Sequence, residues 1–213
     1  MLYIIDDQKD SRDAIKRMIA STGHKAAISE FSYYDEAWHA MDRELPDLLI
    51  IEIGVRNGNG MEFIRKMRLQ HPDVRVLVFT HQDETLYAER ALRVGAHGYL
   101  MKQATQAEFR EAFLSLMRGD YYVSPLIEEK IMRGIAGQEG VDEVNPEQVL
   151  SNRELEIFVK IGEGLSSREI AEQLHLSVKT VETHRAHIKR KLNIRSARDL
   201  VQQAHEWVSH AYA

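Results

Sequence analysis

The sequence predicts an α/β fold, a doubly wound domain with a five-stranded parallel sheet, followed by an all-α domain of four helices with a helix-turn-helix. Two observations support this. Short apolar runs alternate with amphipathic stretches through residue 117, which is the pattern of strands and helices that alternate along the chain. After residue 150, only helical spacing of apolar residues is found.

The front half contains five strand-like and five helix-like segments in strict alternation. The runs 47–53 and 74–80 are apolar except for Asp47, Glu52, Arg75 and Thr80, as expected for strands that are buried on both faces. Glycine or proline follows most of the helical segments and ends them. The expected strands are 2–5, 26–31, 47–53, 74–80 and 98–101, and the expected helices are 12–20, 35–45, 61–70, 84–94 and 106–117.

Charge divides the chain into three parts. Residues 1–118 carry 16 basic and 18 acidic side chains, residues 119–148 carry 2 and 7, and residues 149–213 carry 10 and 8. We therefore expect a front domain over 1–118, a connector over 119–148 and a basic tail domain over 149–213. The connector has one helical pattern over Pro125–Ile135, and we expect residues 137–143 to be mobile.

Composition excludes several classes of protein. The chain has no cysteine, which rules out disulfides and thiolate metal sites and fits a reducing compartment. No apolar run approaches the roughly 20 residues of a membrane span. The start "MLYIIDDQ" becomes acidic too early for a signal peptide. We expect a cytoplasmic protein.

Polar side chains gather at the carboxyl ends of the predicted strands, where doubly wound sheets carry their functional sites. These residues are Asp6, Asp7, Glu52, Thr80 and Lys102. Clustered carboxylates repel one another, and either a divalent cation or the lysine would relieve this repulsion. The candidate metal ligands are therefore Asp6, Asp7 and Glu52.

The tail domain has well-marked helix starts and one strongly basic helix. "SNRE" at 151–154 and "SSRE" at 166–169 are capping boxes. "REIAEQL", the joint "HLSV" and "KTVETHRAHIKRKL" form a helix-turn-helix pattern, in which residues 179–191 carry five basic side chains against Glu182. A basic second helix behind a tight turn is typical of a helix that lies in the major groove of DNA.

Residues 1–117 resemble a response-regulator receiver domain, through "IIDDQ", the "FT" of the fourth strand and "GYLMK". The resemblance implies that Asp6 and Asp7 hold magnesium, that Thr80 and Lys102 contact a phosphoryl group, and that Tyr99 moves with the threonine on switching. It also implies that a partner histidine kinase phosphorylates an aspartate at the position that Glu52 occupies here.

A glutamate at the acceptor position changes the expected chemistry. Its carboxylate reaches about one bond further and can meet Thr80 or Lys102 without modification. It carries one negative charge, against about −1.5 to −2 for a phosphoryl group, and is at best a partial mimic. Displaced geometry also slows in-line attack. We expect no required cofactor and weak magnesium binding.

Residues 150–201 resemble the LuxR-type helix-turn-helix, and the two halves together resemble the NarL/FixJ group of response regulators. The resemblance implies binding to double-stranded DNA as a homodimer. The implied DNA contacts are Lys179, Thr180, Glu182, Thr183, Arg185 and Ala186, with Lys189 and Lys191 near phosphates. The last helix has one apolar face, part of which must cover the core of the domain. The resemblance implies that the rest of this face contacts a second copy of the chain, and the candidates are Leu200, Val201, Ala204, Trp207 and Val208.

The leading hypothesis is a transcription regulator, not an enzyme, with an atypical receiver that works without phosphorylation. Three alternatives stay open. The first is a conventional phospho-switch with Glu52 as an unusual acceptor. The second is a magnesium-dependent phosphoryl hydrolase that uses Asp6, Asp7 and Glu52. The third is an interaction module whose receiver face binds a regulatory protein. The sequence gives no access to the operator or to the direction of regulation.

Overall fold

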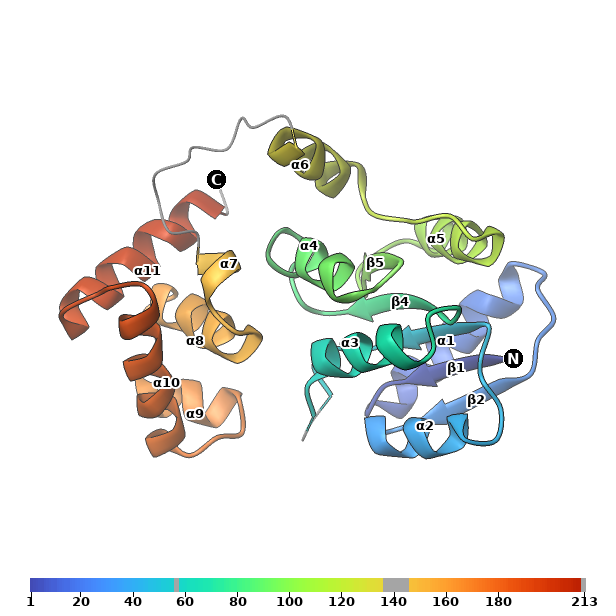
Figure 1. Cartoon of the computed structure of the whole chain (residues 1–213), viewed down its shortest axis with the longest axis horizontal. Coiled ribbons are helices and arrows are strands. Elements are labelled where there is room, and N and C mark those ends of the chain that lie inside the picture. Colours follow the sequence, from blue (N-terminus) through green and yellow to red (C-terminus); the bar gives the residue numbers. More distant parts are fainter. Residues whose placement is uncertain (56–57, 136–145, 212–213) are drawn as a thin grey trace. The chain divides into compact units, whose positions relative to one another are not determined.

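The computed structural model describes residues 1–55, 58–135 and 146–211. It divides into two compact units, Met1–Glu139 and Gly140–Ala213, each of which has its own core (Figure 1). The expected mobility of residues 137–143 lies outside the described residues. None of the helices over the described residues combines the length and apolar character that crossing a bilayer requires.

The first unit contains a parallel sheet of five strands in the order β2-β1-β3-β4-β5. This confirms the predicted α/β class, because each strand is connected to the next through a helix. Every residue of β1 and β3 is buried, as the uninterrupted apolar runs indicated. The strands are β1 Leu2–Ile5, β2 Ile28–Phe31, β3 Leu48–Ile51, β4 Arg75–Thr80 and β5 Gly98–Met101.

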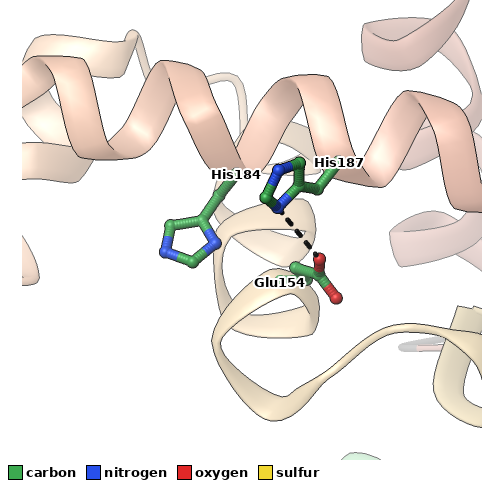
Figure 2. A group of neighbouring side chains, drawn as sticks. All are labelled: Glu154, His184 and His187. Carbon is green, nitrogen blue, oxygen red and sulfur yellow. Dashed lines mark ion pairs between the residues drawn. The ribbon is translucent and has the colours of Figure 1, made fainter.

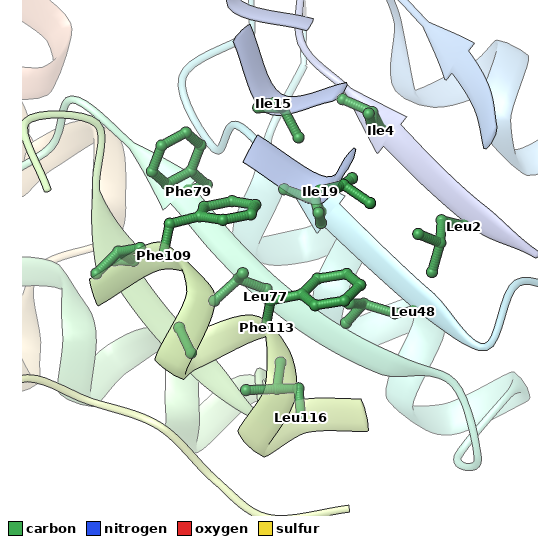
Figure 3. Close-up of a cluster of buried hydrophobic side chains, with 13 residues drawn as sticks. Leu2, Ile4, Ile15, Ile19, Leu48, Leu77, Phe79, Phe109, Phe113 and Leu116 are labelled. Atoms are coloured by element: carbon green, nitrogen blue, oxygen red, sulfur yellow. The ribbon is translucent and has the colours of Figure 1, made fainter. Parts of the chain in front are cut away.

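Five helices accompany the sheet: α1 Lys9–Ser21, α2 Tyr34–Met41, α3 Gly60–Gln70, α4 Glu84–Val94 and α5 Gln106–Arg118. Alternate residues of the strands face α1 and α5, and Figure 3 shows Phe109, Phe113 and Leu116 of α5 packed on Leu77 and Phe79 of β4. Since successive strand residues point to opposite faces, the remaining buried strand residues face the other side of the sheet.

Helix α2 is shorter than the sequence predicted. It ends at Met41 rather than at residue 45, and the chain turns through Arg43 and Glu44, whose amides both donate to the carbonyl of Ala40. Pro46 disfavours a helical conformation at the residue before it, so the helix cannot continue to Leu45. The Glu44 carbonyl instead accepts a hydrogen bond from the Tyr3 hydroxyl at 2.7 Å.

The start of the connector packs on the first unit. The Tyr122 carbonyl accepts from the Tyr99 amide at 3.0 Å, which adds a bridge at the edge of β5. Helix α6, Pro125–Ile135, matches the predicted helical pattern and contacts α4. Lys130 of α6 donates to the Thr85 carbonyl at 2.7 Å, and Ile127 is 2% exposed. The first part of the acidic connector thus extends the front domain.

The second unit is all helical, as predicted. Its helices are α7 Pro146–Val149, α8 Asn152–Gly162, α9 Ser167–Gln173, α10 Val178–Lys191 and α11 Ala197–Ala211. Both predicted capping boxes are present at α8 and α9, and Ser177 caps α10 by accepting from the Thr180 amide. One apolar cluster joins α8 to α9, α10 and α11, so that a domain of this size is stabilised by a single core.

Candidate functional site

The Glu52 carboxylate is the centre of the pocket at the carboxyl edge of the sheet. Its residue follows β3 directly and is only 7% exposed. Oε1 accepts hydrogen bonds from the Thr80 hydroxyl at 2.5 Å and from the Gly54 amide at 2.8 Å. Oε2 lies 2.9 Å from Lys102 Nζ. The longer side chain therefore reaches both groups that the receiver resemblance assigns to a phosphoryl group.

Lys102 lies between two carboxylates. Its Nζ is 2.6 Å from Asp6 Oδ2 as well as 2.9 Å from Glu52 Oε2. Burial alone would lower the pKa of Lys102, but the negative charges of Glu52 and Asp6 and their hydrogen bonds outweigh it and raise the pKa. The lysine is therefore a cation that neutralises part of the carboxylate cluster.

Asp6 is fixed by further donors. It is 1% exposed; Oδ1 accepts from the Gln8 amide at 2.9 Å and Oδ2 accepts from the Ser11 hydroxyl at 2.6 Å. The other acid of the pair, Asp7, is partly exposed. Burial raises the pKa of Tyr34, and the charges of Glu52, Asp7 and Asp6 raise it further, so the three carboxylates share one neighbourhood.

A hydrogen-bonded chain leads from the pocket to Tyr99. The Gln82 amide donates to Thr80 Oγ1 at 3.2 Å, and the Gln82 carbonyl accepts from the Tyr99 hydroxyl at 2.9 Å. Tyr99 is 1% exposed, so its ring is held inside the domain. Sequence reasoning missed Gln82, since it acts through its backbone and its side-chain type carries no signal.

The oxygen-rich pocket has the ligand type that magnesium prefers. However, the Lys102 ammonium already lies 2.6 Å from Asp6 Oδ2 and 2.9 Å from Glu52 Oε2 and neutralises part of their charge, and Asp6 Oδ2 also accepts from Ser11. In this arrangement the residues fit a magnesium ion poorly.

The residues predicted to contact DNA lie along α10 of the second unit. Lys179, Glu182 and Thr183 are exposed, while Thr180 and Lys189 are partly exposed. Glu182 and Arg185 interact within the domain. Glu182 accepts a hydrogen bond from the Ser167 hydroxyl of α9, and Arg185 Nε lies 3.9 Å from the same carboxylate. Glu182 thus joins the two helices of the helix-turn-helix.

Lys191 also has an intramolecular partner. Its Nζ lies 2.6 Å from Oε2 of Glu154, a capping residue of α8 that is 4% exposed. The sequence predicted that Lys191 lies near a phosphate. The structure adds a contact with a nearly buried carboxylate at the α8–α10 junction. The Lys191 side chain is still 36% exposed, so the phosphate contact stays a prediction.

Helix α11 contributes less to a dimer surface than the sequence predicted. Leu200 and Ala204 are both 0% exposed within the domain's own core, so they are not available to a second copy. Trp207 packs on Phe158 with ring centroids 5.8 Å apart. Val201 is 42% exposed and Val208 is partly exposed, so both keep surface for a partner. Leu200 and Ala204 of α11 cover the apolar face of α8, which would otherwise be exposed to water.

Two family models match the chain. One, the response regulator receiver domain, matches residues 2–114. The other, bacterial regulatory proteins of the luxR family, matches residues 148–204. The first covers the sheet and its pocket, and the second covers the helix-turn-helix and most of α11.

Known regulatory proteins are similar to this chain over most of their length. The oxygen regulatory protein NreC of Staphylococcus carnosus is 36% identical, with 95% of each chain covered. The transcriptional regulatory protein DegU of Brevibacillus brevis is 28% identical over 91% of this chain and 87% of its own.

Among solved structures, the two-component response regulator RcsB in complex with DNA has a TM-score of 0.57 at 18% identity. It covers 94% of this chain and 95% of its own. A structure of RcsB from Salmonella enterica serovar Typhimurium bound to the promoter rprA, with the phosphomimetic BeF3-, has a TM-score of 0.56. Its identity is 18%, and it covers 95% of this chain and 96% of its own. These two likenesses show the fold.

These comparisons agree with the resemblance that the sequence showed. They describe a family of transcription regulators rather than of enzymes. The chain belongs to the response regulators in which a receiver domain is followed by a luxR-family DNA-binding domain.

Proposed function

We propose that this chain is a DNA-binding transcription regulator whose receiver is held in its output-competent arrangement by Glu52, without phosphorylation. The observation that carries the proposal is the pair of contacts from one carboxylate to Thr80 at 2.5 Å and to Lys102 at 2.9 Å. These are the two groups to which the family resemblance assigns the phosphoryl oxygens.

The general part follows from the family. A two-component response regulator with a luxR-family domain regulates transcription by binding double-stranded DNA. One solved structure of similar fold contains two RcsB dimers bound to two parallel DNAs. We extend this partnership to the present chain and expect a homodimer that reads two half-sites.

The coupling to Tyr99 supports the output-competent arrangement. A phosphoryl group would draw Thr80 toward the acceptor, and the Glu52 carboxylate already holds Thr80 there. Through Gln82, the same threonine is linked to the buried Tyr99. Because these links are hydrogen bonds between buried or partly buried groups, loss of the bond between Glu52 and Thr80 is expected to change the surroundings of Tyr99.

The contacts of Glu52 also oppose phosphorylation. Both carboxylate oxygens already have partners, so an incoming phosphoryl group would have to displace Thr80 or Lys102 before attack. The extra methylene moves the nucleophilic oxygen by more than about 1 Å from the aspartate position, a displacement that costs on the order of 100-fold in rate.

Substitutions of Glu52 test the proposal in the full-length chain. Glu52→Gln keeps the size but removes the charge that attracts Lys102. We expect weaker dimerisation in light scattering and DNA affinity lowered by roughly 5- to 50-fold in gel-shift titration, within the range of allosteric couplings. Glu111→Gln, an exposed position on α5, is the matched control and should change neither.

Acetyl phosphate with magnesium tests the same site by mass. The parent chain should gain no phosphoryl mass, and neither acetyl phosphate nor beryllofluoride should tighten its DNA binding. Glu52→Asp should restore a response to both. A phosphoryl adduct on Glu52 that tightens DNA binding would instead establish the conventional phospho-switch, with a histidine kinase as the partner. Unchanged binding in Glu52→Gln would show that the carboxylate is not a mimic.

A further inference from the structure

A cluster of one glutamate and two histidines lies at the junction of α8 and α10, away from the receiver pocket. Glu154 belongs to α8, and His184 and His187 belong to α10; Figure 2 shows the His187 ring facing the Glu154 carboxylate. One potential ligand atom from each of the three residues lies within 4.8 Å of the other two. Glu154 Oε1 lies 3.9 Å from His187 Nδ1.

We propose that Glu154, His184 and His187 bind a divalent transition-metal ion, and that zinc is the best fit. One carboxylate oxygen and two imidazole nitrogens from two helices form a ligand set that suits zinc better than magnesium or calcium, which prefer oxygen ligands only. Neither the family match nor the helix-turn-helix pattern assigns an ion to these residues.

The unsatisfied nitrogen of His184 is the second observation. Its Nδ1 is buried and has no hydrogen-bond partner among the described residues. Figure 2 shows the ring of this histidine on the side of α10 where Glu154 and His187 lie. A buried polar atom without a partner is costly, and a bound metal ion would satisfy it.

Only small side-chain movements are needed. Tetrahedral zinc with bonds of about 2.1 Å separates its ligand atoms by about 3.4 Å. The ligand atoms here lie within 4.8 Å, so each pair has to close by no more than about 1.4 Å. The His187 side chain is 43% exposed and has room to rotate. Both histidines lie three positions apart on one face of α10, which suits joint coordination.

Lys191 sets the strength of the site. Its Nζ lies 2.6 Å from Glu154 Oε2, so Oε1 is the oxygen that Glu154 offers to an ion. The ammonium repels any divalent cation and so weakens binding. The two imidazole ligands still favour ions that prefer nitrogen over ions that prefer oxygen. A bound ion would cross-link α8 to α10 and thereby stabilise the recognition helix by mass action.

Cobalt, a spectroscopic substitute for zinc, provides the test in the full-length chain. We expect Co²⁺ to give visible absorption bands of a nitrogen- and oxygen-coordinated ion, and Zn²⁺ to abolish them at one equivalent. Histidine-ring ¹⁵N spectra should show shifts of His184 and His187 on zinc addition. The melting temperature of the second unit should rise with zinc and not with magnesium.

Histidine variants locate the site. His187→Gln and His184→Gln should each weaken zinc binding on the order of 10- to 100-fold. His175→Asn is the matched control in the same domain, because His175 is exposed with φ 52° and asparagine tolerates that conformation. We use His187→Gln as the main variant, since its side chain is 43% exposed. Equal Co²⁺ spectra and affinities in parent and His187→Gln, or no binding in the parent, would overturn the proposal.

Discussion

One methylene distinguishes Glu52 from the aspartate that the family resemblance implies, and our proposal rests on its added reach. Oε1 lies 2.5 Å from Thr80 Oγ1 and Oε2 lies 2.9 Å from Lys102 Nζ, the two groups to which the family resemblance assigns the phosphoryl oxygens. The carboxylate supplies one negative charge and two oxygens, whereas a phosphoryl group supplies up to two charges and three oxygens. We therefore expect constant output of moderate strength rather than a switch.

Magnesium should have little effect on this receiver. The ammonium of Lys102 already lies 2.6 Å from Asp6 and 2.9 Å from Glu52, so its positive charge competes with that of an ion. Because an ion that binds only the folded state raises the melting temperature, a thermal-shift titration measures the affinity. We expect no shift until magnesium reaches about millimolar concentration. A large shift at micromolar magnesium would show that the pocket binds the ion with ordinary affinity.

His97 should make the receiver less stable in mild acid. Its Nδ1 accepts from the Val76 amide at 3.2 Å, so protonation breaks a buried hydrogen bond. Burial, with Arg75 and Arg68, lowers the pKa of His97 from 6.5 to about 4. Between these values the unfolded chain binds more protons than the folded one, so stability rises with pH and is lost as the pH falls.

The expected loss on going from about pH 7 to pH 5 is about 1–2 kcal/mol. The chain has two tryptophans, so Trp207→Phe leaves Trp38 as the sole fluorescent reporter of the receiver in urea unfolding. In that background, His97→Gln should remove most of the pH dependence and His81→Gln, an exposed control, should keep it. An equal slope in both variants would mean that other groups cause the effect.

Among the secondary structure elements, α10 carries two lysines whose surroundings differ. Lys179 is exposed in the first turn, whereas Lys191 in the last turn pairs with the nearly buried Glu154. A helix-start lysine that meets phosphates contributes to affinity on any DNA sequence. A lysine that neutralises a buried carboxylate contributes to the stability of the domain instead.

Alanine substitutions should separate these two roles. Lys179→Ala should weaken binding to all DNA sequences and lower the slope of log affinity against log salt by about one. Lys191→Ala should destabilise the second unit by about 1–3 kcal/mol, because Glu154 keeps its charge without its partner. Gel shifts at two salt concentrations and urea unfolding followed by Trp207 measure the two effects. If the slope of log affinity against log salt falls equally in both variants, Lys191 also contacts a phosphate, as the sequence predicted.

At the scale of the whole molecule, the chain consists of two units with separate cores. The second unit, with its own apolar cluster, should fold as residues 146–213 alone, which circular dichroism can check. This fragment should bind DNA less tightly than the full chain, because paired receivers hold two DNA-binding domains together and raise their effective concentration. Equal affinity of fragment and full chain for a two-half-site operator would mean that the receiver contributes nothing to binding.

The sequence by itself determined the order of elements, the sheet-forming runs and the two capping boxes. These features depend on local spacing: apolar runs with alternating helices specify strands, and Ser-x-x-Glu specifies a helix start. It also identified Asp6, Glu52, Thr80 and Lys102, because the ends of parallel strands meet at one edge. The end of α2 was misplaced, because Pro46 excludes only Leu45 from the helix, whereas the turn toward β3 and the Tyr3 contact to Glu44 go with its end at Met41.

Only the tertiary structure decided which side chains meet across elements. Glu154 and Lys191 are 37 residues apart and gave no pairwise signal, yet their contact changes the expected role of the lysine. Leu200 and Ala204 belong to the same helical stripe as Val201, and only packing against α8 shows which of them are buried. Periodicity tells which residues share a face of a helix. What that face packs against depends on long-range contacts, which a single sequence does not specify.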